Sequence, residues 1–353
     1  MPKILALFAV ALLAPALFAD SVGYMQGKDV AWDNNVEIKA WSWKQVDYVA
    51  EGNKAKVVMR KDLVSVTRSA ENGTMSQNLS KAIMDMAASP GDAQDALLAE
   101  MKDGTPLNKE HATFLLGQLH ASNASGKEAS RDAAIKVADY IKAYGNGFFL
   151  GDAYPLLARM QLQAADTAGA RQAFRDMAKL GAPYDARAQQ SLGELELNAN
   201  NADAALTAFR EASKLTSDKN LRFKAEAWAS LTLSLQKKWD AAKAIAEPIT
   251  KDETLDDPVS TDDDAALGIA YRVLGDCLLE GSQTYEKAYD AYMLASYYSW
   301  WTQGPGEGYC LAQAWRAASK LVGSDEKWKE RKEKLEEALT AGYPNELKAA
   351  KAK

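Results

Sequence analysis

The chain has 353 residues, of which 47% are hydrophobic and 25% are charged, and its formal net charge is −6. This length is too great for one compact core and fits two domains or one elongated array. The mild acidic excess argues against nucleic acid as the main partner, because binding phosphate groups requires a basic face.

Residues 1–19 have the pattern of a secretory signal peptide. Lys3 precedes an apolar run, residues 4–18, and the small residues Ala16 and Ala19 lie near its end, where cleavage after either is expected. The run is shorter than the roughly 20 residues of a membrane-spanning helix, so an uncleaved anchor is the weaker alternative. We therefore expect a periplasmic or secreted protein with no membrane span in the mature chain.

A small antiparallel β domain is expected over residues 20–72. Hydrophobic and polar residues alternate between Val36 and Val66, around a turn at Gly52, whereas residues 20–34 show no clear period. Alternation of period two around a glycine-containing turn is typical of antiparallel strands. We expect three or four strands, as a meander or as a barrel that resembles the small SH3-like barrels preceding helical repeats in exported bacterial proteins.

Helical patterns follow from residue 73 to residue 345, and one of them occurs twice within residues 152–217. Small residues in such a pattern allow two helices to approach closely, and an aromatic ring fills the space between one helix pair and the next. Four markers recur at an offset of 35 residues: Leu157 with Leu192, Ala158 with Gly193, Ala170 with Ala205, and Phe174 with Phe209. A constant offset of this kind indicates a structural repeat.

The pattern resembles the tetratricopeptide repeat (TPR), a helix–turn–helix unit of about 34 residues that stacks into a superhelix. The second copy has the family's small residue at Ala212, whereas the first has Met177 there, and neither copy has the family's common Trp and Pro. The resemblance implies a mainly α fold: a TPR-like α-solenoid of about seven helix pairs behind the β domain. An ordinary helical bundle with coincidental spacing is the alternative.

The remaining helix pairs follow the same spacing less closely. They are expected at 75–102, 107–144, 222–251, 265–298 and 307–341. The charged second helix of the last pair suits a solvated cap, which terminal repeats require. Residues 346–353 are expected to be a basic tail.

No catalytic constellation is recognisable, so we expect neither enzymatic activity nor a cofactor. His111 and His120 are nine residues apart on one helix and cannot share a metal ion, so we expect them on the surface or in a groove. Cys277 and Cys310 are expected to be buried free thiols, with a disulfide as the alternative that export would permit. The acidic loop 252–264 is either a calcium site or, as we favour, a solvated insert whose Asp residues begin the next helix.

The resemblance also implies a binding surface, because the concave face of this family is lined by one side of each first helix. The function expected from it is an exported, non-enzymatic scaffold that binds a protein or peptide carrying both charges. The residues that match the family's concave positions are Arg159, Gln163, Arg187, Gln190, Glu194, Asn198, Arg272 and Asp276.

An alternative function is binding of glycan or cell wall, including a role as an accessory of a hydrolase, through the aromatic cluster 285–315. Trp300, Trp301 and Tyr309 are the candidates for stacking on a ligand, although the core is the commoner place for such rings. A glycan-cleaving enzyme would also need a carboxylate pair across a cleft, and no separate catalytic domain is recognisable.

Overall fold

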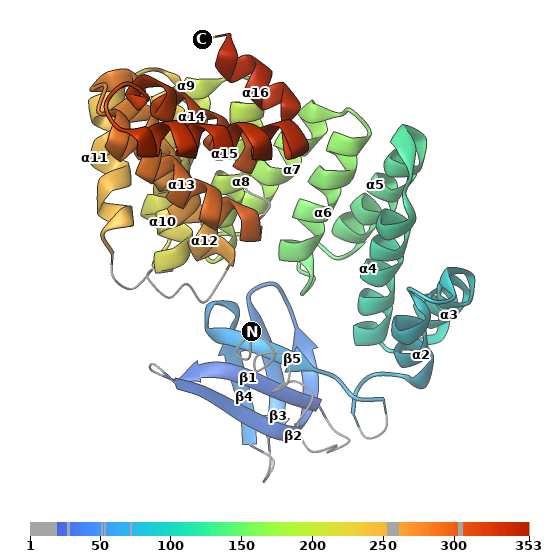
Figure 1. The fold of residues 1–353 in the computed structure, drawn as a ribbon. Helices are drawn as coiled ribbons and strands as arrows, with labels where there is room; N and C mark the ends of the chain where they lie inside the picture. The colour runs from blue at the N-terminus through green and yellow to red at the C-terminus, as the bar shows by residue number, and fades with distance from the viewer. Residues whose placement is uncertain are drawn as a thin grey trace. The chain divides into compact units, whose positions relative to one another are not determined.

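The computed structural model describes residues 20–26, 29–50, 52, 54–70, 73–252, 261–302 and 306–352, without the side chains of 261–264 and 299–302. The expected leader, residues 1–19, lies outside the described residues. The chain divides into two compact units, residues 1–184 and 185–353, which we call the N-terminal and C-terminal units. An antiparallel sheet followed by paired helices confirms the mainly α fold class (Figure 1).

The sheet of the N-terminal unit has five strands: β1 (Asp20–Gln26), β2 (Asp29–Trp41), β3 (Gln45–Ala50), β4 (Lys54–Met59) and β5 (Leu63–Thr67). Neighbouring strands are antiparallel in the order β4-β3-β2-β1-β5. After the short 3-10 helix η1 (Arg60–Asp62), β5 pairs with β1, so the last strand closes back on the first. The sheet therefore differs from a simple meander, in which each strand pairs only with the strands before and after it in the chain.

The sequence pattern missed β1 and the first half of β2. A Cβ atom on Gly23 would lie 3.0 Å from the indole of Trp32, so the ring covers the glycine in the facing strand. Met25, Val30 and Trp32 are exposed, while Val22 is fully buried. Apolar side chains therefore occur on both faces of this hairpin, and the period-two alternation that marks a half-buried strand is lost.

The N-terminal unit continues with three helix pairs: α2 (Gln77–Asp85) with α3 (Pro90–Asp103), α4 (Pro106–Asn123) with α5 (Gly126–Ala143), and α6 (Leu150–Gln163) with α7 (Thr167–Ala178). Side-chain oxygens of Ser76, Thr105 and Asp166 accept hydrogen bonds from the first-turn N–H groups of α2, α4 and α7. These N-caps satisfy donors that the helices cannot, and they fix where each helix begins.

The C-terminal unit contains four helix pairs and a final helix among its described residues. They are α8 (Tyr184–Asn198) with α9 (Ala202–Leu215), α10 (Lys219–Leu235) with α11 (Trp239–Thr250), α12 (Thr261–Asp276) with α13 (Tyr285–Thr302), α14 (Glu307–Leu321) with α15 (Glu326–Gly342), and α16 (Pro344–Lys351). A π-helical turn, η3 (Cys277–Gly281), follows α12 directly.

The expected basic tail is wrong, because its residues as far as Lys351 belong to α16. Pro344 is the first residue of this helix, where its missing N–H costs nothing. Leu347 and Ala350, three residues apart, are buried in the core cluster that includes Trp315 and Leu339. The apolar face of α16 therefore packs on the last helix pair, while its lysines remain outside.

One contact recurs in the helix pairs of the C-terminal unit. A Cβ atom on Gly193 of α8 would lie 2.5 Å from the ring of Phe209 of α9, and one on Gly275 of α12 would lie 2.7 Å from the ring of Tyr292 of α13. Both rings are fully buried. The aromatic ring of the second helix thus rests on the backbone of the first helix at the small residue, which is the register that the repeat spacing predicts.

The two cysteines are buried and free, as expected. Burial raises the pKa of the Cys277 thiol to about 11 and that of Cys310 to about 12. Both thiols therefore stay protonated at neutral pH, whereas a reactive cysteine needs a lowered pKa. Among the helices that the structure describes, none combines the length and the apolar character needed to cross a membrane.

The sheet is tied to the helices of its own unit through Glu110 of α4. The indole Nε1 of Trp41, at the end of β2, donates to Glu110 Oε2 at 2.8 Å. The Tyr140 hydroxyl and the Phe148 N–H donate to Oε1 at 3.0 and 2.6 Å. Trp41 also stacks on Phe148, with ring centroids 4.9 Å apart. Burial raises the pKa of Glu110, and these three donors oppose that rise by stabilising the carboxylate.

A buried arginine occupies the other side of the same tryptophan. The Arg68 guanidinium lies 4.8 Å from the Trp41 ring and donates to the Thr74 hydroxyl, the Thr74 carbonyl and the Asn108 amide oxygen. Thr74 in turn donates its hydroxyl to the fully buried carboxylate of Asp20 at 2.6 Å. The first and last strands are thereby fixed to the start of the helices.

The expectation of a surface or groove histidine is wrong for His111. Its ring lies 4.7 Å from Phe149 in a stacked arrangement and 5.9 Å from Trp41 edge to face. Its Nδ1 is 3.3 Å from Arg68 Nη1. Burial, and then the positive charge of Arg68, lower the pKa of His111 to about 3. The ring is therefore neutral in the folded protein at neutral pH.

We expect Gly193→Ala to lower the free energy of unfolding by roughly 1–3 kcal/mol, because the added methyl group would meet a fully buried ring. Chemical denaturation measures this change. Gly342→Ala at the end of α15 is the control, since nothing lies within 4 Å of its Cβ position. Adding Phe209→Leu to Gly193→Ala should restore part of the loss. Equal stability of both glycine variants would contradict the packing described for this pair.

We also expect acid to destabilise the protein through His111. Between pH 6.5 and about 3 the unfolded chain binds a proton that the folded chain does not, so stability that is complete above pH 6.5 is lost as pH falls. The loss should approach about 1.4 kcal/mol per pH unit within this window.

Urea unfolding of the wild type and of His111→Gln, followed by tryptophan fluorescence from pH 7 to pH 4, tests this expectation. The raised pKa of Glu110 acts in the opposite direction, but it is common to both proteins, so the difference isolates His111. His120→Gln is the control. Parallel pH profiles for wild type and His111→Gln would show that the ring titrates normally.

Candidate functional site

Two of the expected groove residues lie on α6 in the N-terminal unit. Arg159 and Gln163 are four residues apart, so they lie on the same side of the helix, and both are exposed. Their neighbours Ala158 and Met160 are buried. The first helix of this pair therefore presents one polar side to solvent while its other side packs in the core.

Four expected groove residues lie on α8 in the C-terminal unit, and they divide by burial. Arg187 and Asn198 are exposed and Glu194 is half-buried. Gln190 is only 4% exposed, and its Nε2 donates to Glu194 Oε1 at 2.8 Å. The expectation of an open groove position is therefore wrong for Gln190, which holds Glu194 in place instead.

Asp276 of α12 is also buried, at 5% exposure. Its Oδ1 accepts hydrogen bonds from the hydroxyls of Tyr292 and Tyr309 at 2.7 and 2.9 Å, and its Oδ2 accepts from Ser234 Oγ at 3.1 Å. Burial, and then the charge of Asp276, raise the pKa of both tyrosines. This carboxylate joins α10, α12, α13 and α14 and is not available as an open ligand position, which corrects the expectation.

The same hydrogen-bond network includes Tyr309, one of the three residues expected to stack on a ligand. Tyr309 is half-buried, and the Arg272 guanidinium lies 4.2 Å from its ring. One face of Tyr309 is therefore already occupied by a cation and its hydroxyl by Asp276, so it is not an open stacking platform. The side chains of Trp300 and Trp301 lie outside the described residues. Among the aromatic side chains of this cluster that the structure describes, Tyr297 is the exposed one, at 62%.

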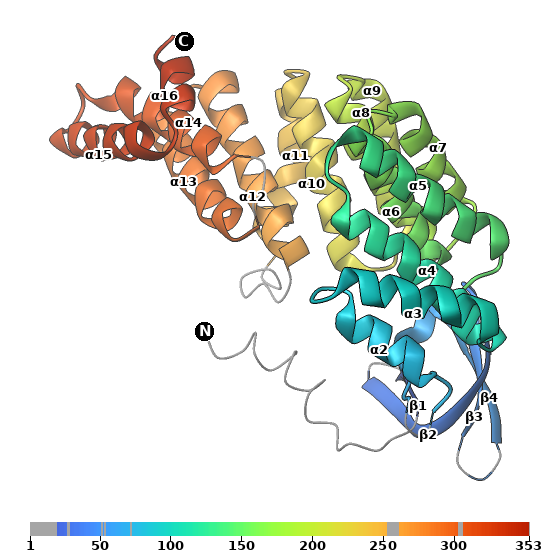
Figure 2. The same ribbon diagram turned by 90° about the vertical axis from the view of Figure 1, so that its right-hand side faces the viewer.

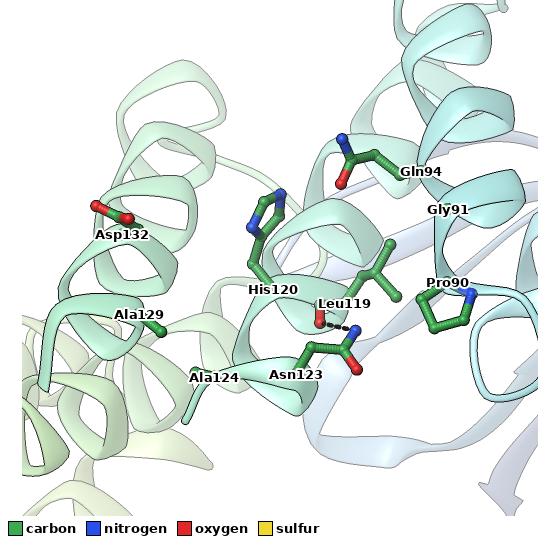
Figure 3. Close-up of a pocket in the computed structure, with 9 residues that line it drawn as sticks. All are labelled: Pro90, Gly91, Gln94, Leu119, His120, Asn123, Ala124, Ala129 and Asp132. Atoms are coloured by element: carbon green, nitrogen blue, oxygen red, sulfur yellow. Dashed lines mark hydrogen bonds between the residues drawn. The ribbon is translucent and has the colours of Figure 1, made fainter. Parts of the chain in front are cut away.

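A hollow of about 330 Å³ lies in the N-terminal unit between α3 and α5, above the last turn of α4. Figure 3 shows the ring of His120 standing between Gln94 of α3 and Asp132 of α5. Asn123 closes the end of the helix by donating to the Leu119 carbonyl at 2.9 Å. Burial, and then the charge of Lys136, lower the pKa of His120, while Asp132 raises it.

A second hollow, of about 290 Å³, lies one repeat further along, between α5 and α7 above α6. Ala138 and Ile141 of α5 form one wall, Leu157 and Gln161 of α6 the floor, and Ala173 of α7 the other wall. The two hollows thus arise at the same place in successive repeats, where consecutive second helices diverge above a first helix. Each has the size for a single side chain or a small ligand, at the lower limit of ordinary binding pockets.

Metal chemistry finds no support among the described residues, in which no three or more His, Cys, Asp or Glu side chains come together as a possible metal site. The acidic loop lies mostly outside the described residues. Its first member, Asp252, accepts a hydrogen bond from Lys219 Nζ at 2.9 Å.

Among the comparisons with known proteins, the one with solved structures bears on the fold alone. No family model matches the sequence, and no curated protein matches it. The structure of pilF from Pseudomonas aeruginosa aligns at 16% identity with a TM-score of 0.50, over 70% of this chain and 99% of that one. The chain therefore has a TPR-like fold.

Two further solved structures align more loosely. A tetratricopeptide repeat protein from Parabacteroides merdae aligns over 74% of this chain and 99% of its own, at 15% identity and a TM-score of 0.41. The TPR domain of P58(IPK) aligns over 75% of this chain and 79% of its own, at 13% identity and a TM-score of 0.26.

Proposed function

We propose that this protein is an exported, non-enzymatic scaffold that binds a protein or peptide partner through the polar sides of its first helices. The observation that carries the proposal is the exposure of Arg159 on α6 and of Arg187 on α8, the first helices of the two clearest repeats. Neither arginine forms an ion pair within the described part of the chain.

The chemistry of these positions favours a partner that carries carboxylates. A guanidinium group offers a planar set of donors that binds a carboxylate through two parallel hydrogen bonds. Gln163 lies one turn beyond Arg159, and Asn198 lies three turns beyond Arg187, so each arginine has an exposed amide on its own side of the helix. Such amides suit the peptide backbone of a partner.

The buried members of the expected groove support this surface without forming it. Gln190 positions Glu194, and Asp276 joins four helices from the interior. The glycan alternative is weaker for the same reason, because Tyr309 is already engaged by Asp276 and Arg272.

We expect the double charge reversal Arg159→Glu/Arg187→Glu to lower recovery of the partner by at least about tenfold, because like charges would then face its carboxylates. The protein is immobilised, incubated with an envelope extract of the source organism, and the captured proteins are quantified by mass spectrometry. Arg175→Glu/Arg210→Glu is the matched control, since both side chains are exposed but lie on second helices.

Binding through exposed charges should also weaken as ionic strength rises. A parallel sedimentation assay with peptidoglycan tests the glycan alternative. Capture that is equally reduced in both double variants, or sedimentation with peptidoglycan that both variants retain, would overturn the proposed surface.

The export part of the proposal predicts that the mature chain begins at Asp20. The structure gives a reason for this position: β1 begins there, and the buried Asp20 carboxylate accepts hydrogen bonds from the Ser69 N–H at 2.9 Å and from the Thr74 hydroxyl. Cleavage after Ala19 would leave the whole sheet intact. Mass spectrometry of the N-terminus of exported protein checks this, and an intact Met1 in that fraction would exclude cleavage.

A further inference from the structure

Strand β4 is an edge strand of the sheet, and we call its unpaired side the open margin. Its residues pair with β3 on one side, and the strand order places no described strand on its other side (Figure 2). The main-chain N–H and C=O groups along such a margin are a template for an added strand, and proteins commonly block it with charges, bulges or a covering segment.

The outward side chains of β4 are apolar and exposed. Val57 is 57% exposed and Met59 is 44% exposed, while Val58 between them points into the core. Elsewhere on the sheet Lys39 forms an ion pair with Glu37 on β2. A sheet face that meets water is normally polar, so the exposed apolar pair on β4 needs an explanation.

Other exposed apolar residues of the sheet differ in position. Met25, Val30 and Trp32 lie on the hairpin of β1 and β2, in which these two strands pair with each other and only the second half of β2 pairs with β3. At the opposite margin, β5 carries the exposed Val64, but its pairing with β1 shifts register beside that residue. Apolar side chains and a regular open margin coincide at β4.

An exposed lysine lies at each end of β4, and the half-buried Asp62 follows the second of them. Lys54 begins the strand, and Lys61 follows its end; both are exposed, and neither has an ion-pair partner within the described residues. Lys44, opposite the end of β4, points its ammonium at the ring of Trp43. Lys56, two residues after Lys54 and therefore on the same side of the strand, differs because it is neutralised by Asp33 at 2.8 Å.

We propose that β4 is a docking margin for an extended segment of a partner protein, which adds to the sheet as a further strand. The segment has acidic residues at both ends, opposite Lys54 and Lys61, and apolar side chains at alternate positions, opposite Val57 and Met59. Main-chain hydrogen bonds supply affinity in this mode, and the alternate side chains supply specificity. The proposal is independent of the first-helix surface.

The test uses the purified protein and a short synthetic peptide with Glu at both ends and Val alternating with Thr between them. Binding is measured by fluorescence anisotropy, and protection of the β4 amides by hydrogen exchange. We expect saturable binding that weakens with salt and slows exchange in β4. Two control peptides separate the contributions: one with Lys at both ends, and one with alternate amides N-methylated, which removes main-chain donors.

Protein variants locate the site. Val57→Thr/Met59→Thr, which removes the apolar contacts without a change of charge, should weaken binding at least tenfold, whereas Val64→Thr on β5 should leave it unchanged. All three side chains are exposed, so the variants should fold, which circular dichroism verifies.

Four outcomes would overturn the proposal: no binding of the acidic peptide, equal binding of the Lys-ended peptide, equal binding of the N-methylated peptide, or equal loss in both protein variants. A concentration-dependent dimer that Val57→Thr/Met59→Thr abolishes would identify a second copy of this chain as the occupant and would also overturn the proposal.

Discussion

The contact between an aromatic ring of one helix and the bare backbone of a glycine on its partner controls how closely the helices of a pair can pack. Phe209 lies on Gly193 and Tyr292 on Gly275, and both rings are completely buried. Interiors are packed as densely as organic crystals, so such a site tolerates no added methyl group without a shift of its neighbours. The contact recurs in two pairs at the repeat register, so α8 with α9 and α12 with α13 share the same close approach.

Buried polar groups give this apolar framework its specific connections. Glu110 accepts hydrogen bonds from the end of β2, from α5 and from the turn before α6, and Asp276 accepts them from three other helices. A buried carboxylate is costly unless it is fully hydrogen-bonded, so each one enforces the arrangement of its donors. Because their oxygens already accept these hydrogen bonds, Glu110 and Asp276 are unavailable to a ligand. Surface function is therefore left to residues such as Arg159 and Arg187, which the framework positions but does not use.

The two proposed surfaces rely on different physics. The first helices offer separate charged side chains, which recognise a partner's charges and give salt-dependent association. Strand β4 offers a continuous row of main-chain groups beside Val57 and Met59, which recognise the extended conformation of a segment. A scaffold with both surfaces could bind two features of one partner or two different partners, and the two modes are separable because the residues that carry them are far apart in the sequence.

The sequence by itself determined the helix pairs and the repeat register, because Gly193, Ala205 and Phe209 interact within one pair and their spacing is visible in the chain. It also indicated the strands around Gly52, where hydrophobic residues alternate. Only the tertiary structure decided which polar residues are buried. Asp276 receives its donors from Ser234 and Tyr309, which are 42 and 33 residues away, and His111 is enclosed by Trp41 and Phe149, so no local pattern distinguishes these residues from exposed ones. The burial of a polar side chain depends on partners that the fold brings together, whereas periodicity reports only on neighbours along the chain.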